Sequence, residues 1–271
     1  MYDKVGFEDY ALEKLLDKLN REIILQWTCK LDKPECIKKS VDLFAAWRND
    51  STKQIPRNAR PAVYCTAIKE GSSSDWDFLW NHYRHTNFAS EKKIIIDALG
   101  CSNNKTVLQN YLKEAIKKYN PTNADIRRQD VSAVFTSVYS AGSVGVNVTL
   151  NFLTENIDTL YDYFQKWDDI ANLFVNTAAH VSTEVEYGQA KYFVERHERR
   201  FPENLQVRLR SAVTTAESNL LWFKNNGYKI RQWIMSLNPE KQKPDSSTRI
   251  ESFNIVLTTL IALVSYLLSR F

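Results

Sequence analysis

Four histidines are the only imidazoles that could bind a metal or transfer protons, and their spacing predicts no catalytic site. His82 and His85 are three residues apart, which would place both on one helical face, but their aromatic neighbours favour two ordinary half-buried side chains. His197 opens a segment like the H-E-x-x-H zinc helix, but Phe201 stands where the second histidine is required. His180 precedes a Ser-Thr-Glu run that is explained more simply as the cap of the next helix.

One charged cluster could contact a ligand without doing chemistry. Arg127, Arg128, Gln129 and Asp130 could bind an anion or face a peptide, although Arg and Asp near a helix start more often form surface ion pairs. The sequence contains no serine-nucleophile motif, no phosphate-binding loop and no suitable cysteine and histidine pair. The residues by themselves therefore predict a binding or structural role, with no catalytic or metal-ligating residue assigned.

The cysteines lack the C-x-x-C spacing of a zinc site. Two disulfides are the preferred interpretation, with three pairings open, and four reduced core thiols are the alternative. The four positions are Cys29, Cys36, Cys65 and Cys101. Three glycosylation sequons, about as many as chance would give, begin at Asn49, Asn104 and Asn147.

The elements that carry these residues are predicted to be helices almost throughout. Seven glycines in 271 residues disfavour all-β folds and glycine-rich nucleotide loops, and a net charge of +4 is too small to indicate nucleic-acid binding. Apolar residues recur at helical spacing from Leu12 to Ile234. Short helices joined by brief turns predict an all-α, HEAT/armadillo-like α-solenoid of antiparallel helix pairs, with a compact helical bundle as the alternative.

Several helix boundaries follow from capping residues. Pro61 is expected to open a helix that Gly71 ends, Ser74 to cap the next, and Ser90 to cap another that ends at Gly100. Another helix is expected from residue 126 to 138. The last helix carries a seam with alternating steps of four and three residues. The seam consists of Leu209, Val213, Ala216, Leu220, Phe223, Gly227, Ile230 and Ile234.

The C-terminal segment predicts attachment to a membrane. Twelve of the seventeen residues 253–269 are apolar and none is charged, and the small polar residues Asp245, Ser246 and Ser247 precede them as in a GPI-attachment signal. A tail anchor and a buried terminal helix are the alternatives. Residues 236–252 are expected to form a polar stalk.

The ordered motifs resemble the C-terminal helical domain of zinc aminopeptidases of the aminopeptidase N type. The resemblance covers residues 1–235, with 253–271 as a tail like that of insect GPI-anchored forms. The motifs that carry it are Tyr2-Asp3-Lys4-Val5-Gly6-Phe7, Trp27-Thr28-Cys29, Ile55-Pro56-Arg57-Asn58-Ala59-Arg60, Val63-Tyr64-Cys65, Asp75-Trp76-Asp77-Phe78, Ala98-Leu99-Gly100-Cys101-Ser102, Ile126-Arg127-Arg128-Gln129-Asp130, Ser182-Thr183-Glu184, Asn219-Leu220-Leu221-Trp222 and Gln232-Trp233-Ile234.

The resemblance implies a disulfide between Cys29 and Cys36 and another between Cys65 and Cys101. It also implies that the domain encloses a peptide cavity and gates access to it. The family's zinc helix and its G-x-M-E-N exopeptidase loop belong to an upstream catalytic domain, and neither motif is present here. No cofactor is therefore expected on this chain, and Zn is expected in the catalytic domain of the parent enzyme.

The implied partners are that catalytic domain, peptide substrates and the outer face of the plasma membrane, with a homodimer open and no nucleic acid. Lys53, Arg57 and Arg60 could line a peptide-facing wall, although a solvated surface is the simpler interpretation. The chain is expected to be a fragment of a longer enzyme, because Met1 opens no signal peptide. A free-standing, non-catalytic surface module and a cytosolic scaffold are the competing hypotheses.

Overall fold

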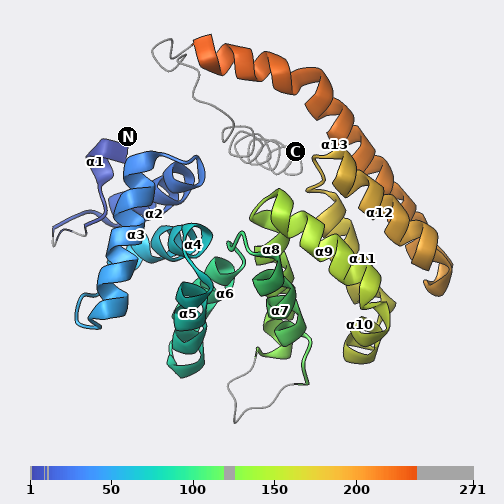
Figure 1. Ribbon diagram of the computed structural model, residues 1–271, viewed down its shortest axis with the longest axis horizontal. Helices are drawn as coiled ribbons and strands as arrows, with labels where there is room; N and C mark the ends of the chain where they lie inside the picture. The colour runs from blue at the N-terminus through green and yellow to red at the C-terminus, as the bar shows by residue number, and fades with distance from the viewer. Residues whose placement is uncertain (1, 9, 11, 119–125, 237–271) are drawn as a thin grey trace. The chain divides into compact units, whose positions relative to one another are not determined.

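The computed structural model describes residues 2–8, 10, 12–118 and 126–236, which form helices and connecting turns without any strand (Figure 1). The predicted all-α architecture of antiparallel helix pairs is confirmed. The chain divides into two compact units, Met1–Ala141 and Gly142–Phe271. The range expected to form one partial domain, 1–235, therefore includes the first unit and part of the second.

The first unit is a series of helix pairs. Helices α2, α4, α6 and α8 pack against one another in chain order, and α3, α5 and α7 pair with α4, α6 and α8. Stacking each pair on its neighbours is the packing of a helical solenoid. The helices are α1 (Tyr2–Val5), α2 (Leu15–Lys30), α3 (Pro34–Asn49), α4 (Arg60–Glu70), α5 (Ser73–His85), α6 (Ala89–Leu99), α7 (Lys105–Ala115) and α8 (Val131–Ser140).

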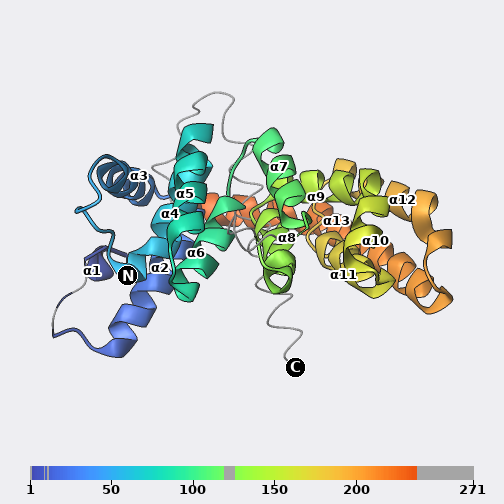
Figure 2. The ribbon, with the colours of Figure 1, turned by 90° about the horizontal axis from the view of Figure 1, so that it is seen from below.

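The second unit is built around α11, which packs against α9, α10 and α13, while α12 packs against α9 and α13 (Figure 2). Phe174 on α11 and Phe193 on α12 stack with ring centroids 4.4 Å apart in its core. The helices are α9 (Ser143–Glu155), α10 (Ile157–Phe164), α11 (Trp167–Ala178), α12 (Glu184–His197) and α13 (Glu203–Ser236).

The helix boundaries correct several of the predictions. Pro61 lies in the first turn of α4 and Gly71 follows its end, as expected. Helix α5 is capped by Ser72 and not by Ser74, because Asp75 closes a capping box with Ser72. Helix α6 begins after Phe88, so Ser90 lies inside its first turn.

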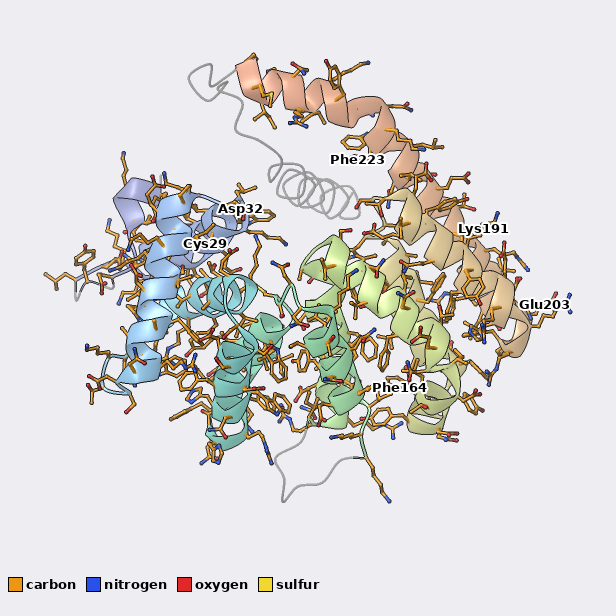
Figure 3. The ribbon with its side chains drawn as sticks, viewed as in Figure 1. Cys29, Asp32, Phe164, Lys191, Glu203 and Phe223 are labelled. Atoms are coloured by element: carbon orange, nitrogen blue, oxygen red, sulfur yellow. A yellow bond between two sulfur atoms is a disulfide. The ribbon has the colours of Figure 1, made fainter. Side chains whose placement is uncertain are left out.

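The helix expected at 126–138 differs in extent, and the predicted seam of the last helix is only partly buried. A 3₁₀ turn over Arg128–Asp130 precedes α8, which therefore begins later than residue 126. The seam of α13 is buried at Leu209, Ala216, Leu220 and Gly227, and the helix packs on α11 and α12. Phe223, labelled in Figure 3, lies further along the seam and is only half-buried.

Among the helices within residues 2–236 that the structure describes, none is both long and apolar enough to cross a bilayer. The stalk expected at 236–252 overlaps α13 at Ser236, and its remaining residues lie outside the described part of the chain. The attachment residues Asp245, Ser246 and Ser247 and the tail at 253–271 lie outside it as well.

Candidate functional site

The four histidines occupy ordinary structural positions. His85 and His180 each place Nδ1 near the backbone carbonyl four residues earlier, at 2.8 and 2.9 Å. His197 is buried, and its Nε2 lies 2.9 Å from the carbonyl oxygen of Thr154. Across the described ranges, no three His, Cys, Asp or Glu side chains are grouped so that they could hold a metal ion. The described residues therefore do not form a zinc site.

A buried carboxylate joins three helices of the first unit. Glu91 on α6 accepts a hydrogen bond from the Tyr64 hydroxyl at 2.7 Å and an ion-paired one from Arg60 Nη1 at 2.6 Å. Nε2 of His82 on α5 lies 3.8 Å from Oε1 of Glu91, which is longer than a normal hydrogen bond. We call Arg60, Tyr64, His82 and Glu91 the Glu91 cluster.

The electrostatics of the Glu91 cluster favour the charged carboxylate. Burial would raise the pKa of Glu91, but the neighbouring His82, Tyr64 and Arg60 outweigh it and lower the pKa to about 2. Burial, followed by the adjacent carboxylate, raises the pKa of Tyr64, so its hydroxyl remains a donor. Glu91 is therefore ionised at neutral pH and does not act as a proton donor there.

The Glu91 cluster contributes to helix packing rather than to ligand binding. Arg60 also donates from Nε to the carbonyl oxygen of Ile55 at 3.1 Å, which fixes the turn before α4. Trp47 stacks on Tyr64 at 5.3 Å between centroids and meets the His82 ring edge-on at 4.9 Å. Arg60 is thus engaged inside the unit, whereas Lys53 and Arg57, the other two residues considered for a peptide-facing wall, are exposed.

The predicted peptide-facing cluster is a charged surface patch. Arg127 donates from Nε to Asp130 Oδ2 at 2.7 Å, and Arg127, Arg128 and Gln129 are exposed. Lys92 on α6 belongs with them, since burial and then the charge of Arg127 lower its pKa. We call these five residues the Arg127 patch. Sequence reasoning missed Lys92, because it is 35 residues from Arg127 and no local pattern connects them.

The patch presents cations and one carboxylate from two chain segments. The ammonium group of Lys92 lies 4.8 Å from the ring centroid of buried Tyr83 on α5, which positions the lysine by a cation–π contact. Guanidinium groups are suited to binding carboxylates in two-point fashion. The arrangement can bind an anionic group, such as a peptide carboxylate.

The Ser-Thr-Glu run does cap α12, as predicted. The Thr183 side chain accepts from the backbone of Glu186 at 3.3 Å, and Glu186 accepts in return from the backbone of Thr183 at 3.1 Å. The buried carboxylate of Glu186 also accepts a hydrogen bond from the hydroxyl of Ser143 at the start of α9, so the cap joins α12 to α9. Glu186 is not among the predicted residues, although the spacing of Thr183 and Glu186 is that of a capping box.

Both disulfides that the resemblance implies are present. Cys29 bonds Cys36 across the turn between α2 and α3, and Cys65 on α4 bonds Cys101 just after α6, with S–S distances of 2.05 and 2.08 Å. Cys29, labelled in Figure 3, lies in the last turns of α2. No cysteine is left free, so the alternative of four reduced thiols does not describe this structure.

The described segments form a helical-repeat domain: antiparallel helices stack on one another, and two disulfides join neighbouring segments of the first unit. Residues 1–216 match the family described as the ERAP1-like C-terminal domain, and the chain belongs to this family.

Relatives with similar sequences are aminopeptidases. The chain is 30% identical over 155 residues to membrane alanyl aminopeptidase of Manduca sexta, covering 57% of this chain and 15% of that protein. It is 21% identical over 267 residues to aminopeptidase N of Plutella xylostella, covering 98% of this chain and 28% of that protein. It is 28% identical over 225 residues to aminopeptidase N of Homo sapiens, covering 82% of this chain and 22% of that protein. The chain thus spans less than a third of the length of each of these relatives.

Proposed function

We propose that this chain is the C-terminal helical domain of a membrane-anchored zinc aminopeptidase that removes N-terminal residues from peptides. One observation carries the proposal: residues 1–216 match the C-terminal domain family, and the relatives that share this region bear aminopeptidase names. In this proposal the domain encloses the peptide cavity and limits which peptides reach the zinc.

The zinc ligands belong, in this proposal, to a separate catalytic domain, because the described residues of this chain do not group into a metal site. When bound there, zinc would polarise the scissile carbonyl and activate water. This chain's contribution is to bind and orient the peptide through surface charge and shape. In this proposal the cations of the Arg127 patch contact a peptide carboxylate.

The proposed location is the outer face of the plasma membrane, reached through the secretory route. Two disulfides are typical of an oxidising compartment, and one relative is named a membrane aminopeptidase. The finer proposal is an insect GPI-anchored form. Release of the protein from isolated membranes by a phosphatidylinositol-specific phospholipase C would support it, and retention would contradict it.

The parent enzyme is tested by sequencing the complete transcript. A reading frame that contains G-x-M-E-N and H-E-x-x-H before the codon for Met1 is the expected result. A mature transcript without a catalytic region would contradict the enzyme proposal and favour a non-catalytic surface module.

Gating is tested in the parent enzyme with Arg127→Ala and Arg128→Ala together. We expect the KM for a peptide of several residues to rise about two- to fivefold, the size of one or two exposed charge contacts, while turnover of an aminoacyl anilide stays unchanged. Arg200→Ala is the matched control, because Arg200 forms an exposed ion pair with Asp158 in the other unit. Equal effects on both substrates, or none on the peptide, would contradict peptide contact at the patch.

A further inference from the structure

The three glycosylation sequons, which the sequence cannot rank, lie in different environments. Asn49 is exposed at the end of α3, and Asn104 is exposed just before α7. Asn147 is half-buried within α9. An acceptor amide must tolerate a bulky, hydrated glycan on its nitrogen in the folded protein, so these environments decide which sequon can carry one.

Asn104 has a geometry that tolerates modification. Its Oδ1 accepts hydrogen bonds from the backbone nitrogens of Thr106 and Val107 at 3.0 and 3.2 Å, and so caps α7. A glycan is joined through Nδ2, which these capping bonds do not use. Lys105 and Thr106 are exposed as well, so the whole sequon is open to solvent.

Transfer of a glycan to Asn104 leaves its helix cap intact. The donor is a lipid-linked oligosaccharide pyrophosphate, a co-reactant of the secretory route. A bond forms between Nδ2 and the anomeric carbon of the sugar, the bond from that carbon to the pyrophosphate oxygen breaks, one amide proton is lost to the transferase, and the lipid pyrophosphate leaves. Nothing is oxidised or reduced, and Oδ1 of Asn104 remains an acceptor for the first turn of α7.

Asn147 is committed to packing between two helices. Its Nδ2 donates to Oε1 of Gln189 on α12 at 3.2 Å, and Gln189 donates in turn to Asn151 Oδ1 at 2.9 Å. Thr149, the hydroxyl residue of this sequon, is fully buried. A glycan on Asn147 would have to occupy the space between α9 and α12, so a chain modified there could not pack these helices.

We propose that Asn104 carries an N-linked glycan that leaves its helix cap in place, and that Asn147 is unmodified in the folded protein. The proposal rests on the secretory route of the proposed function. It adds a covalent modification site at the N-cap of α7 and places a hydrated glycan at the start of that helix.

The test is glycopeptide mapping of the full chain produced through the secretory route of eukaryotic cells. Peptide N-glycosidase converts a glycosylated Asn to Asp, which identifies residues 49, 104 and 147 separately in one digest. We expect conversion at Asn104 and none at Asn147. Unmodified Asn104 in protein whose two disulfides have formed would overturn the proposal while leaving the secretory route intact, and a glycan on folded Asn147 would overturn its second part. Reduced cysteines with no glycan at any sequon would overturn the route and the glycan together.

Matched variants separate the glycan from the cap. Asn104→Asp keeps an oxygen for capping and Thr106→Val keeps Asn104 itself, and both should lose the glycan while the chain stays folded. Thr149→Val is the control, since it removes the Asn147 sequon and should change no glycan. A change in the glycan on Asn104 in this control, or a glycan retained at residue 104 in Thr106→Val, would contradict the assignment.

Discussion

The hydroxyl of Tyr64 on α4 donates a hydrogen bond to Oε1 of Glu91 on α6, with 2.7 Å between the oxygens. The two residues are 27 positions apart and both are buried. Arg60 holds the other carboxylate oxygen, so one side chain of α6 satisfies two donors of α4. The contact between α4 and α6, central in the first unit, is therefore polar as well as apolar.

Glu91→Gln should destabilise the first unit. The amide keeps the shape of the buried Glu91 side chain but removes the charge opposite the half-buried Arg60, which we expect to cost about 1–3 kcal/mol in the free energy of unfolding. Urea unfolding at neutral pH measures the effect. Glu195→Gln, at an exposed ion pair with Lys191, should cost no more than about 1 kcal/mol. Equal costs for the two variants would show that the Glu91 cluster does not stabilise the fold.

Acid should weaken the first unit through the same carboxylate. The pKa of Glu91 is lowered from an ordinary 4.5 to about 2, so the unfolded chain binds the proton first as the pH falls. The stabilisation is complete above pH 4.5 and is lost towards pH 2. Urea midpoints across this window should fall more steeply for the wild-type chain than for Glu91→Gln. Parallel pH profiles for the two proteins would be inconsistent with an ionised Glu91.

The two disulfides should differ in their contribution to stability. In the chain-entropy picture, the longer loop closed by Cys65 and Cys101 contributes about 3.8 kcal/mol, and the short loop closed by Cys29 and Cys36 about 2.5 kcal/mol. Replacing each pair by alanines and measuring the urea midpoint tests this order. A larger loss from the short loop would indicate that native packing around the sulfurs, and not chain entropy, sets the value.

Two glycines should respond to alanine in opposite directions. A Cβ on Gly100, at the end of α6, would lie 2.6 Å from the carbonyl oxygen of Ser137 and closer still to its Oγ, so α6 and α8 would have to separate. We expect Gly100→Ala to cost about 1–3 kcal/mol. Gly188, within α12, has nothing within 4 Å of such a Cβ, and Gly188→Ala should stabilise by about 0.5–1 kcal/mol. Thermal unfolding of both variants is the measurement, and a tolerated Gly100→Ala would contradict the close approach of α6 to α8.

Capping residues and apolar periodicity predicted most helices of the fold. The contacts between helices could not be predicted in the same way, because they join residues far apart in the sequence. Pro61 marked the first turn of α4 because its fixed φ suits that position whatever surrounds it. The predicted cap at Ser74 is wrong because several serines are adjacent in the sequence, and Asp75, three residues after Ser72, forms the capping box with Ser72. Periodicity identifies buried faces of helices, but it does not indicate which faces meet.

The candidate site shows the same limit. Arg127 and Asp130 are close in sequence, and the ion pair between them was foreseen as one interpretation. Lys92 and Glu91 were missed, since their partners come from other helices and depend on how α6 packs. The resemblance supplied the disulfide pairing, which spacing alone had left open among three alternatives.

The disulfide between Cys65 and Cys101 encloses the last turn of α4 and all of α5 and α6. A protease that cuts the backbone anywhere between these two cysteines therefore produces no separate fragments, because the two pieces stay covalently joined. Such a nicked chain would run as one band on a denaturing gel until the sample is reduced. The first unit thus retains its connectivity after damage that would divide an unbridged helical repeat.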